Sequence, residues 1–321
     1  MLKYRANRLQ SGKEQDILSI IMDEVKFFQN WNIAFETRTS LTPSGSPNRS
    51  VSRFVAADRD GRKYIAEGFE LRKKSRQTAQ NVLLEHLAAH RMAGVFPYLR
   101  TASGTHGVVT DGCFWQLRHW QEADGAELRR RDPEKFAALC AGILLQMRRI
   151  SLETTLPMPP NEQFYFAPYL LRLESFAAQK MPVLRRDLQH ICSRLDGFLN
   201  REKSLPAMFA HGDFHPGNIL TCHGELAAVI DWEFTGWKHP GYDLALLLGC
   251  LGRDDISWLT GANGAVLQNQ LYRAEYMPDA AWEQLTGLIA AVRLGWLGEW
   301  IDLGETELAV QEVDFINFLL D

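Results

Sequence analysis

The stretch from His211 to Glu233 holds the residue types whose spacing could do chemistry. It contains two carboxylates, Asp213 and Asp231, and the side-chain amide of Asn218. Sparse oxygen ligands of this kind suit a Mg²⁺ ion that is shared with substrate phosphates. A separate aspartate can accept a hydrogen bond from an attacking hydroxyl, because phosphoryl transfer depends on positioning and charge neutralisation more than on covalent catalysis. These residues therefore predict a site for phosphoryl transfer.

A β-hairpin is expected to bring the amide and the second carboxylate together. Two short apolar runs flank a turn at His223-Gly224. Folding the chain about this turn places Asn218 opposite Val229 or Ile230. Asn218 and Asp231 then lie at the same open end of the hairpin.

Asp213 precedes the hairpin on a loop that Gly212 and Gly217 are expected to loosen. Taken alone, an Asp-x-x-x-x-Asn spacing is a common accident, and an aspartate at a strand end is often a turn or cap residue. The combination of loop, hairpin and following helix is much harder to obtain by chance. His211 and His215 are interpreted as structural hydrogen-bonding residues of the loop rather than proton carriers, because the aspartate already fills that role.

The elements around this passage change in character along the chain. Residues 51–57 and 63–69 have the pattern of strands joined at Asp60-Gly61, and residues 107–120 have that of two strands broken at 110–112. Beyond Asp124-Gly125 long helical patterns dominate. We expect an α+β fold with a β-rich lobe at 1–120, a helical lobe at 121–321 and a ligand-binding cleft between them. Helices are predicted at residues 14–30, 76–92, 133–150, 168–180, 183–200, 254–272, 280–303 and 305–319.

The spacing of Asp213 and Asn218 matches the catalytic loop of protein kinases. The fuller string His-Gly-Asp-x-His-Pro-x-Asn, followed by Ile-Asp-Trp-Glu, resembles the aminoglycoside phosphotransferase and choline kinase family, whose fold is similar to that of protein kinases. The resemblance covers roughly residues 35–255 and is strongest over residues 208–245. It implies a protein-kinase-like, two-lobed α+β fold with a small β-rich N-lobe and a larger helical C-lobe.

The resemblance carries over to individual residues of the second half. It implies that Asp213 is the catalytic aspartate and that Asn218 and Asp231 are Mg²⁺ ligands. Residues 239–245 match the family's helix after the metal-binding strand. There Asp243 would brace the catalytic loop rather than act on substrate.

The resemblance also implies an ATP-binding half. The turn that holds Gly45, Ser46 and Asn48 resembles the nucleotide-covering turn, in which backbone N–H groups donate to phosphates. An ordinary polar loop is the alternative reading of this turn. Backbone groups from His119 to Gln121 would bind adenine.

One position departs from the family. The strand that begins at Lys63 carries Glu67 where the family has a lysine that pairs with the α- and β-phosphates. A glutamate would repel phosphate unless Mg²⁺ or a nearby cation intervened. Lys63, Lys73 and Lys74 are candidate replacements for the missing cation. Glu85, on the following helix, is the expected partner carboxylate of the usual lysine.

Two hypotheses of different classes follow. The leading one is an ATP- and Mg²⁺-dependent kinase that phosphorylates the hydroxyl of a small molecule such as an amino sugar, an aminoglycoside, choline or homoserine. The alternative, motivated by Glu67, is a weak or inactive pseudokinase that acts as a binding protein. Phosphorylation of proteins ranks last, because no activation segment of the protein-kinase type follows Asp231. Trp296, Trp300 and several acidic residues of the terminal helices would suit a cationic amine, although a solvated face over a packed one is the simpler explanation.

Composition limits the other classes of protein. Of the 321 residues, 46% are hydrophobic and 23% charged, as in ordinary globular proteins. A net charge of −4 and a pI near 6.2 disfavour nucleic acid as the partner. Five scattered cysteines disfavour a disulfide framework or a zinc site. Because neither a secretory apolar region nor a bilayer-spanning stretch is present, we expect a cytoplasmic protein without a membrane partner.

Overall fold

A computed structural model describes residues 23–43, 50–125, 127–158 and 163–321. The chain divides into two compact units. The first unit comprises residues 1–81 and 97–120, and the second comprises residues 82–96 and 121–321. The boundary between the units falls inside helix α2 (Lys74–Ala89). This helix confirms the one predicted at 76–92. The functional assignment of lobes at 1–120 and 121–321 stays a prediction.

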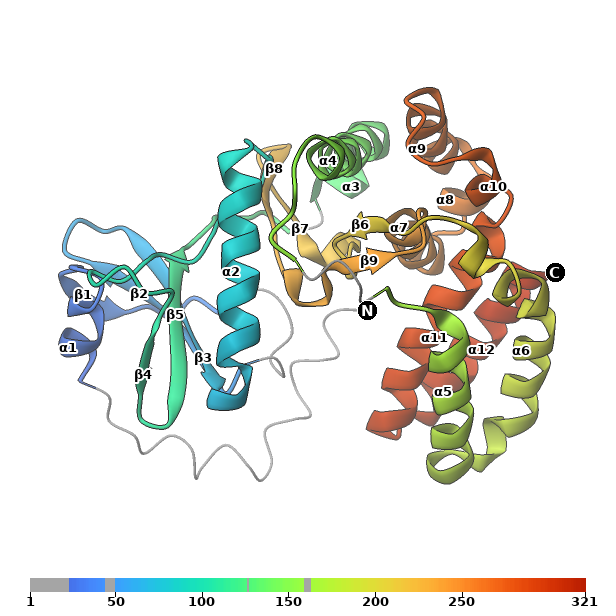
Figure 1. The fold of residues 1–321 in the computed structure, drawn as a ribbon, viewed down its shortest axis with the longest axis horizontal. Coiled ribbons are helices and arrows are strands. Elements are labelled where there is room, and N and C mark those ends of the chain that lie inside the picture. Colours follow the sequence, from blue (N-terminus) through green and yellow to red (C-terminus); the bar gives the residue numbers. More distant parts are fainter. Residues whose placement is uncertain (1–22, 44–49, 126, 159–162) are drawn as a thin grey trace. The chain divides into compact units, whose positions relative to one another are not determined.

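The first unit is built on a five-stranded antiparallel sheet with the strand order β1-β2-β3-β5-β4 (Figure 1). The predicted strands at 51–57, 63–69 and 107–120 are confirmed, whereas β1 lies in a stretch whose polar composition did not indicate a strand. The strands are β1 (Phe35–Arg38), β2 (Ser52–Asp58), β3 (Lys63–Glu70), β4 (Val108–Thr110) and β5 (Cys113–His119).

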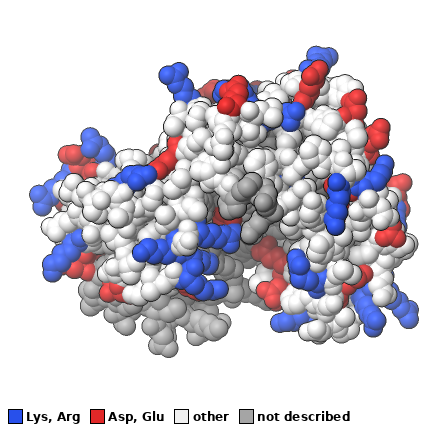
Figure 2. All heavy atoms as spheres, in the orientation of Figure 1, with Lys and Arg blue, Asp and Glu red and all other residues white. Residues whose placement is uncertain are grey.

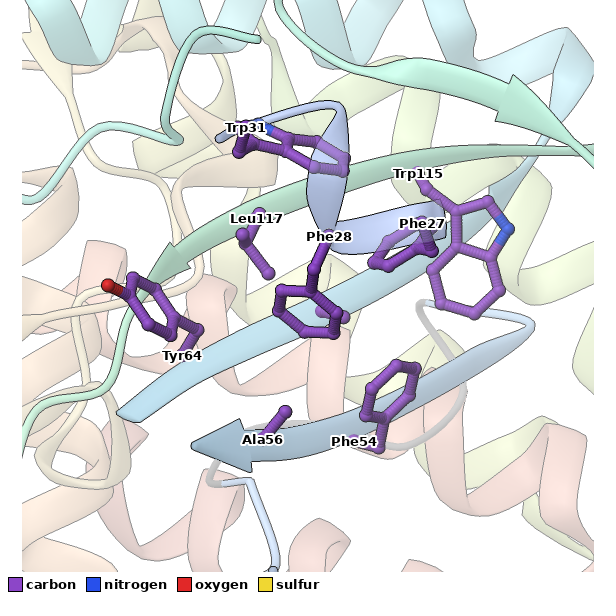
Figure 3. Close-up of a cluster of buried hydrophobic side chains, with 9 residues drawn as sticks. Phe27, Phe28, Trp31, Phe54, Ala56, Tyr64, Trp115 and Leu117 are labelled. Atoms are coloured by element: carbon purple, nitrogen blue, oxygen red, sulfur yellow. The ribbon is translucent and has the colours of Figure 1, made fainter. Parts of the chain in front are cut away.

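Helix α1 (Glu24–Gln29) covers one face of this sheet with aromatic side chains (Figure 3). The Asp23 side chain caps the helix by accepting the N–H of Lys26. Of the helix predicted at 14–30, residues 14–22 lie outside the described residues. The cluster is made of buried residues from α1, the turn that follows it and three strands: Phe27, Phe28, Trp31, Phe54, Ala56, Tyr64, Ala66, Trp115 and Leu117.

The two hairpins of the sheet turn differently. Asp111 (φ 50°) and Gly112 (φ 71°) both have positive φ, as a two-residue type I′ turn requires. At the predicted Asp60-Gly61 turn only Gly61 has positive φ (78°), so the hairpin is correct but its turn type is not type I′. The carboxylate of Asp58 stabilises that turn by accepting two backbone N–H groups and the Tyr64 hydroxyl.

The second unit is largely helical, with two small antiparallel sheets, β6-β9 and β7-β8 (Figure 1). Helix α11 packs against α5, α6, α7 and α12. In the described residues no helix combines the length and apolar character needed to cross a membrane. The α-helices are α3 (Glu127–Arg131), α4 (Pro133–Glu153), α5 (Phe166–Lys180), α6 (Arg185–Leu199), α7 (Tyr242–Asp254), α8 (Ser257–Thr260), α9 (Ala262–Arg273), α10 (Asp279–Trp282), α11 (Leu285–Leu303) and α12 (Thr306–Leu320). The strands are β6 (Met208–Ala210), β7 (Ile219–Cys222), β8 (Glu225–Val229) and β9 (Gly236–Lys238), and the 3₁₀ turns are η4 (Pro182–Leu184), η5 (Glu202–Ser204), η6 (Pro216–Asn218) and η7 (Trp232–Phe234). A further 3₁₀ turn, η3 (Leu71–Lys73), precedes α2 in the first unit.

Two of the predicted helices are broken in the structure. The pattern at 254–272 is divided between the end of α7, α8 and α9, because Gly261 takes an extended conformation between the last two. The pattern at 280–303 is divided between α10 and α11. Helical periodicity continues across both breaks, so it could not reveal them. The helices predicted at 133–150, 168–180 and 305–319 are confirmed, and that at 183–200 corresponds to α6 with η4 before it.

Candidate active site

The hairpin that was predicted to assemble the site is confirmed. Ile219 pairs with Val229, and the N–H of Ile230 donates to the carbonyl oxygen of Asn218 at 3.0 Å. The turn lies at His223-Gly224, where φ is 52° and 77°. Asn218 therefore stands opposite Ile230, next to Asp231 in the chain.

Asp124 anchors this hairpin from far away in the sequence. Its N–H donates to the carbonyl oxygen of Thr221 at 2.8 Å, and its carboxylate accepts the Thr221 hydroxyl and, at 2.7 Å, the N–H of His223. On the other strand, the N–H of Val229 donates to the carbonyl oxygen of Gly94 at 2.8 Å. Sequence reasoning took Asp124 only as a boundary, because its partners lie almost a hundred residues later.

Asn218 and Asp213 are joined directly. The side-chain Nδ2 of Asn218 donates to the carbonyl oxygen and to Oδ2 of Asp213, both at 2.9 Å. Both partners are acceptors, so they fix the orientation of a buried amide that would otherwise be ambiguous. The amide oxygen consequently faces away from Asp213, where it is available as a ligand.

Asp231 follows β8 in a left-handed conformation, with φ 65° and ψ 53°. Such a backbone costs a non-glycine residue on the order of 1 kcal/mol, and aspartate tolerates it better than most residues. Its half-buried carboxylate and the Asn218 amide oxygen are hard donors that fit Mg²⁺, an ion that usually takes further ligands from water and substrate phosphates. In the described part of the chain no group of three or more His, Cys, Asp or Glu side chains could hold a metal ion alone.

Asp243, in the first turn of α7, is fully buried against the loop. Its carboxylate accepts the N–H of His211 at 2.7 Å and that of Gly212 at 2.9 Å. Burial raises the pKa of this carboxyl to about 6, and the two donated hydrogen bonds oppose that shift. Through these two hydrogen bonds Asp243 holds the backbone of the loop before Asp213, as its expected bracing role requires.

Gly212 tightens the loop rather than loosening it, which corrects the expectation from sequence. Its φ is +82°, and a Cβ atom placed there would lie 2.0 Å from the carbonyl oxygen of Phe234. Only glycine allows both this backbone and this close approach.

Both ring nitrogens of His211 contact backbone. Nδ1 accepts the N–H of Asp213 at 3.1 Å, so Nε2 carries the proton that it donates to the carbonyl oxygen of Ile230 at 3.0 Å. The ring thus connects the loop of Asp213 to the end of the hairpin.

His215 lies beside the predicted catalytic carboxylate. Its Nδ1 accepts the N–H of Gly217 at 3.1 Å, and its Nε2 is 3.8 Å from Oδ2 of Asp213. The ring meets that of Trp296 edge-on, with centroids 5.6 Å apart. From the sequence Trp296 was considered with Trp300 as a residue that would suit a cationic amine, but its contact with His215 could not be inferred.

In the first unit, the carboxylate of Glu67 on β3 has two side-chain hydrogen-bond partners. Its Oε2 accepts the hydroxyl of Tyr98 at 2.7 Å and the Nε–H of Arg118 at 3.2 Å. Both partners were missed from sequence, although an arginine in the largely buried strand β5 is a signal. Gly45, Ser46 and Asn48 lie outside the described residues.

The remaining nucleotide-binding candidates are distributed over both units. His119 ends β5 in the first unit, where its ring lies 5.1 Å from that of Tyr64. Gln121 begins the next stretch of the second unit, and Glu85 lies half-buried on the part of α2 that belongs to that unit. Their roles in nucleotide binding stay predictions.

Comparison with known structures shows that the fold is that of kinases. The chain is similar to amicoumacin kinase hAmiN in complex with AMP-PNP, Ca²⁺ and Ami (TM-score 0.68, 16% identity, 94% of this chain and 93% of that one). It is also similar to a thermostable mutant of aminoglycoside phosphotransferase APH(4)-Ia in a ternary complex with ADP and hygromycin B (TM-score 0.65, 14% identity, 92% and 96%). An aminoglycoside phosphotransferase from Alicyclobacillus acidocaldarius subsp. acidocaldarius DSM 446 matches with a TM-score of 0.61 at 16% identity, over 92% and 93% of the chains.

Residues 45–288 match the model of the phosphotransferase enzyme family, APH, and the chain belongs to that family. This confirms the resemblance inferred from the loop and hairpin motifs, together with the kinase-like α+β fold. No curated protein sequence matches the chain.

Proposed function

We propose that the protein transfers the γ-phosphoryl group of ATP, with Mg²⁺, to a hydroxyl group of a small molecule. The observation that carries this proposal is the rigid link between Asp213 and Asn218 in a loop braced by Asp243. That link would hold the Asp213 carboxylate for a hydroxyl and leave the Asn218 amide oxygen, which faces away from Asp213, for a metal ion.

Asp213 is the group proposed to orient the acceptor. Its carboxylate would accept a hydrogen bond from the hydroxyl, whose oxygen forms a bond to the γ-phosphorus while the bond from that phosphorus to the β,γ-bridging oxygen breaks. ADP leaves, and the hydroxyl proton passes to Asp213 or to solvent. A Mg²⁺ ion held by Asn218 and Asp231 would neutralise phosphate charge.

The acceptor class follows from family membership and from the chemistry near the loop. Amicoumacin kinase hAmiN is described in a complex with AMP-PNP, Ca²⁺ and Ami, and the APH(4)-Ia mutant in a complex with ADP and hygromycin B. For this chain we infer an alcohol that fits beside His215 and Trp296. An aromatic ring at that place suits either the C–H face of a sugar or a cationic amine.

The test is a screen of ATP turnover over amino sugars, aminoglycosides, choline, homoserine and other alcohols, with product detected by mass spectrometry. Asp213→Ala should abolish product formation, whereas Asp187→Ala, at an exposed acid of α6, should leave it unchanged. Acceptor phosphorylation that survives Asp213→Ala undiminished would overturn the proposal. ATP binding without turnover on any acceptor would instead favour a binding protein with the kinase fold.

A further inference from the structure

A buried lysine of the second unit lies beside the loop of Asp213 without a hydrogen-bond partner. On the face drawn in Figure 2, lysine and arginine side chains project from the surface, as their hydration favours. Lys238, the last residue of β9, is instead only 8% exposed. Among the described residues, no atom accepts a hydrogen bond from its ammonium and no carboxylate lies within 4 Å of it. Burying three unmatched N–H donors and a charge opposes folding, so a contribution to stability does not explain this lysine.

The nearby carboxylate of Asp243 does not match these donors. Burial lowers the pKa of Lys238, and the charge of Asp243 opposes that fall. The oxygens of Asp243, however, already accept the backbone N–H groups of His211 and Gly212. The two charges therefore attract each other through space, while the N–H donors of the ammonium are not used within the described part of the chain.

Two aromatic rings hold the ammonium in place. Its Nζ lies 5.0 Å from the ring centroid of Phe164 and 4.9 Å from that of Tyr242. Cation–π attraction offsets part of the lost hydration and leaves the ammonium able to donate to an oxygen. The half-buried Tyr242 has a hydroxyl that also lacks a hydrogen-bond partner among the described residues. A cation and a neutral hydroxyl donor are thus neighbours, which is a combination that suits an anion.

Both donors lie near the carboxylate that is proposed to orient the acceptor. A Cβ atom placed on Gly212 would lie 2.7 Å from Cε of Lys238, so the missing side chain leaves room for the lysine next to Asp213. Burial raises the pKa of Tyr242, and the charges of Asp243 and Asp213 raise it further. The hydroxyl of Tyr242 is therefore protonated at neutral pH and lies within the field of Asp213.

The same aromatic residues connect the lysine to the place assigned to the acceptor. The ring of Phe164 lies 6.1 Å from that of Tyr169, whose hydroxyl donates to a backbone carbonyl of α11 at 3.1 Å. Trp296, on the same helix, contacts the ring of His215. Lys238 and the pair of His215 and Trp296 consequently belong to one connected set of side chains within the second unit.

We propose that Lys238 and Tyr242 bind an anionic group of the acceptor, a carboxylate or a phosphate ester, while Asp213 orients its hydroxyl. The inference rests on the proposed function and narrows its acceptor to a hydroxy acid or a phosphorylated alcohol. The ammonium supplies the charge and the phenol hydroxyl a second hydrogen bond. A bound anion also favours the charged form of the lysine, which burial alone disfavours.

Acceptors that differ in one charged group test this on the full chain with ATP and Mg²⁺. Two series serve as probes: glycerol, D-glycerate and glycerol 3-phosphate, and D-glucose, D-glucuronate and glucose 1-phosphate. In at least one series kcat/KM for an acidic member should exceed that for the neutral alcohol about tenfold or more, as a charge-assisted hydrogen bond provides. Comparison of the two acids in each series distinguishes a carboxylate from a phosphate ester.

Lys238→Met should remove the preference for the acid by raising its KM, while kcat for the neutral alcohol stays within about threefold. Tyr242→Phe, which removes only the hydroxyl, should cause a smaller loss. Lys203→Met is the matched control, because Lys203 is exposed although its Nζ lies 5.1 Å from the ring of Tyr165, and it should behave like the wild type. Melting curves give a readout without turnover: at millimolar concentration the preferred acid should stabilise the wild type and not Lys238→Met.

Three results would overturn the inference. The wild type could show no preference for the acids in either turnover or melting curves, or Lys238→Met could keep the preference. Lys238→Met could also lower kcat equally for acids and neutral alcohols, which would assign the ammonium to the transferred phosphoryl group instead. If no alcohol of either kind is phosphorylated, the proposed function itself fails, and the melting curves alone decide whether Lys238 binds an anion.

Discussion

The loop of Asp213 and the centre of the first unit's sheet each depend on one buried carboxylate, but the two carboxylates work differently. Asp243 accepts two backbone N–H groups, so its partners are fixed by the path of the chain. Glu67 accepts hydrogen bonds from two side chains, those of Tyr98 and Arg118, which come from other parts of the first unit. A substitution near Asp243 therefore leaves its donors in place as long as the backbone keeps its path, whereas the donors of Glu67 are lost when Tyr98 or Arg118 is replaced.

The backbone network should be the easier of the two to destroy. Gly212→Ala places a Cβ atom 2.0 Å from the carbonyl oxygen of Phe234 at a positive φ. We expect a loss of about 3 kcal/mol or more in the free energy of unfolding, or a displaced loop with activity reduced at least a hundredfold. Denaturant unfolding and acceptor turnover measure the two effects. Gly197→Ala in α6, where a Cβ atom meets nothing within 4 Å, should stabilise the protein by roughly 0.5 kcal/mol.

Two buried ion pairs should differ in how much they contribute to stability. Arg293 donates from Nε and Nη2 to Glu312 at 2.6 Å each, and both side chains are at most 5% exposed. Arg293→Met leaves Glu312 buried without this partner and should cost about 3–5 kcal/mol, much of which Arg293→Met/Glu312→Leu should restore. Arg118→Gln should cost less stability, because Glu67 keeps the hydroxyl of Tyr98 as a donor. Equal stability losses in urea for Arg293→Met and Arg118→Gln would contradict the contrast.

Activity should depend on the ionisation of Asp243. The pKa of this carboxyl is about 6 in the folded protein. Once it is protonated, the group is neutral and its hydrogen bonds with the two backbone N–H groups are weaker. Turnover should therefore fall as the pH decreases through about 6. Asp243→Asn should be about tenfold or more less active at pH 7.5 and show a flatter acid limb, because two charge-assisted hydrogen bonds are weakened at every pH. A pH–rate profile unchanged by the substitution would show that the acid limb has another origin.

Stability should respond to pH in opposite directions at two buried groups. The pKa of Asp243 is raised from 3.8, so between about pH 4 and 6 the folded state binds more protons there and this group lowers stability as the pH rises. Burial lowers the pKa of His239 from 6.5 to about 4, so over a similar window the unfolded state binds more protons and stability rises with pH. Asp243→Asn should leave a steeper rise of melting temperature between pH 4 and 6, and His239→Gln a shallower one. Melting curves across this range would contradict the assignment if either slope changed in the opposite sense.

The smallest effect on stability is expected at Lys238. Its ammonium lies 5.0 Å and 4.9 Å from the ring centroids of Phe164 and Tyr242, and burial lowers its pKa. Lys238→Met keeps most of the buried volume and removes a desolvated charge, so the melting temperature at pH 7 should stay within a few degrees of the wild type or rise. A large fall would show that the cation–π contacts outweigh the desolvation cost.

The sequence predicted best what is fixed by neighbouring residues. The hairpin of Asn218 and Asp231 followed from its turn, and most helices followed from their periodicity. Contacts between side chains distant in the chain were not accessible: Tyr98 and Arg118 are 31 and 51 residues from Glu67, and His215 meets Trp296 across the second unit. Gly212 was recognised as important for the wrong reason, because a close approach to Phe234 depends on tertiary structure.

The most direct test of the account compares the wild type with Asp213→Asn at saturating ATP and acceptor. Asparagine keeps the size of the side chain and removes its charge, so kcat should fall by a factor of about 10² to 10⁴ while the affinity for ATP stays within about threefold. Turnover by Asp213→Asn at the wild-type rate would contradict the assignment of phosphoryl transfer to this loop.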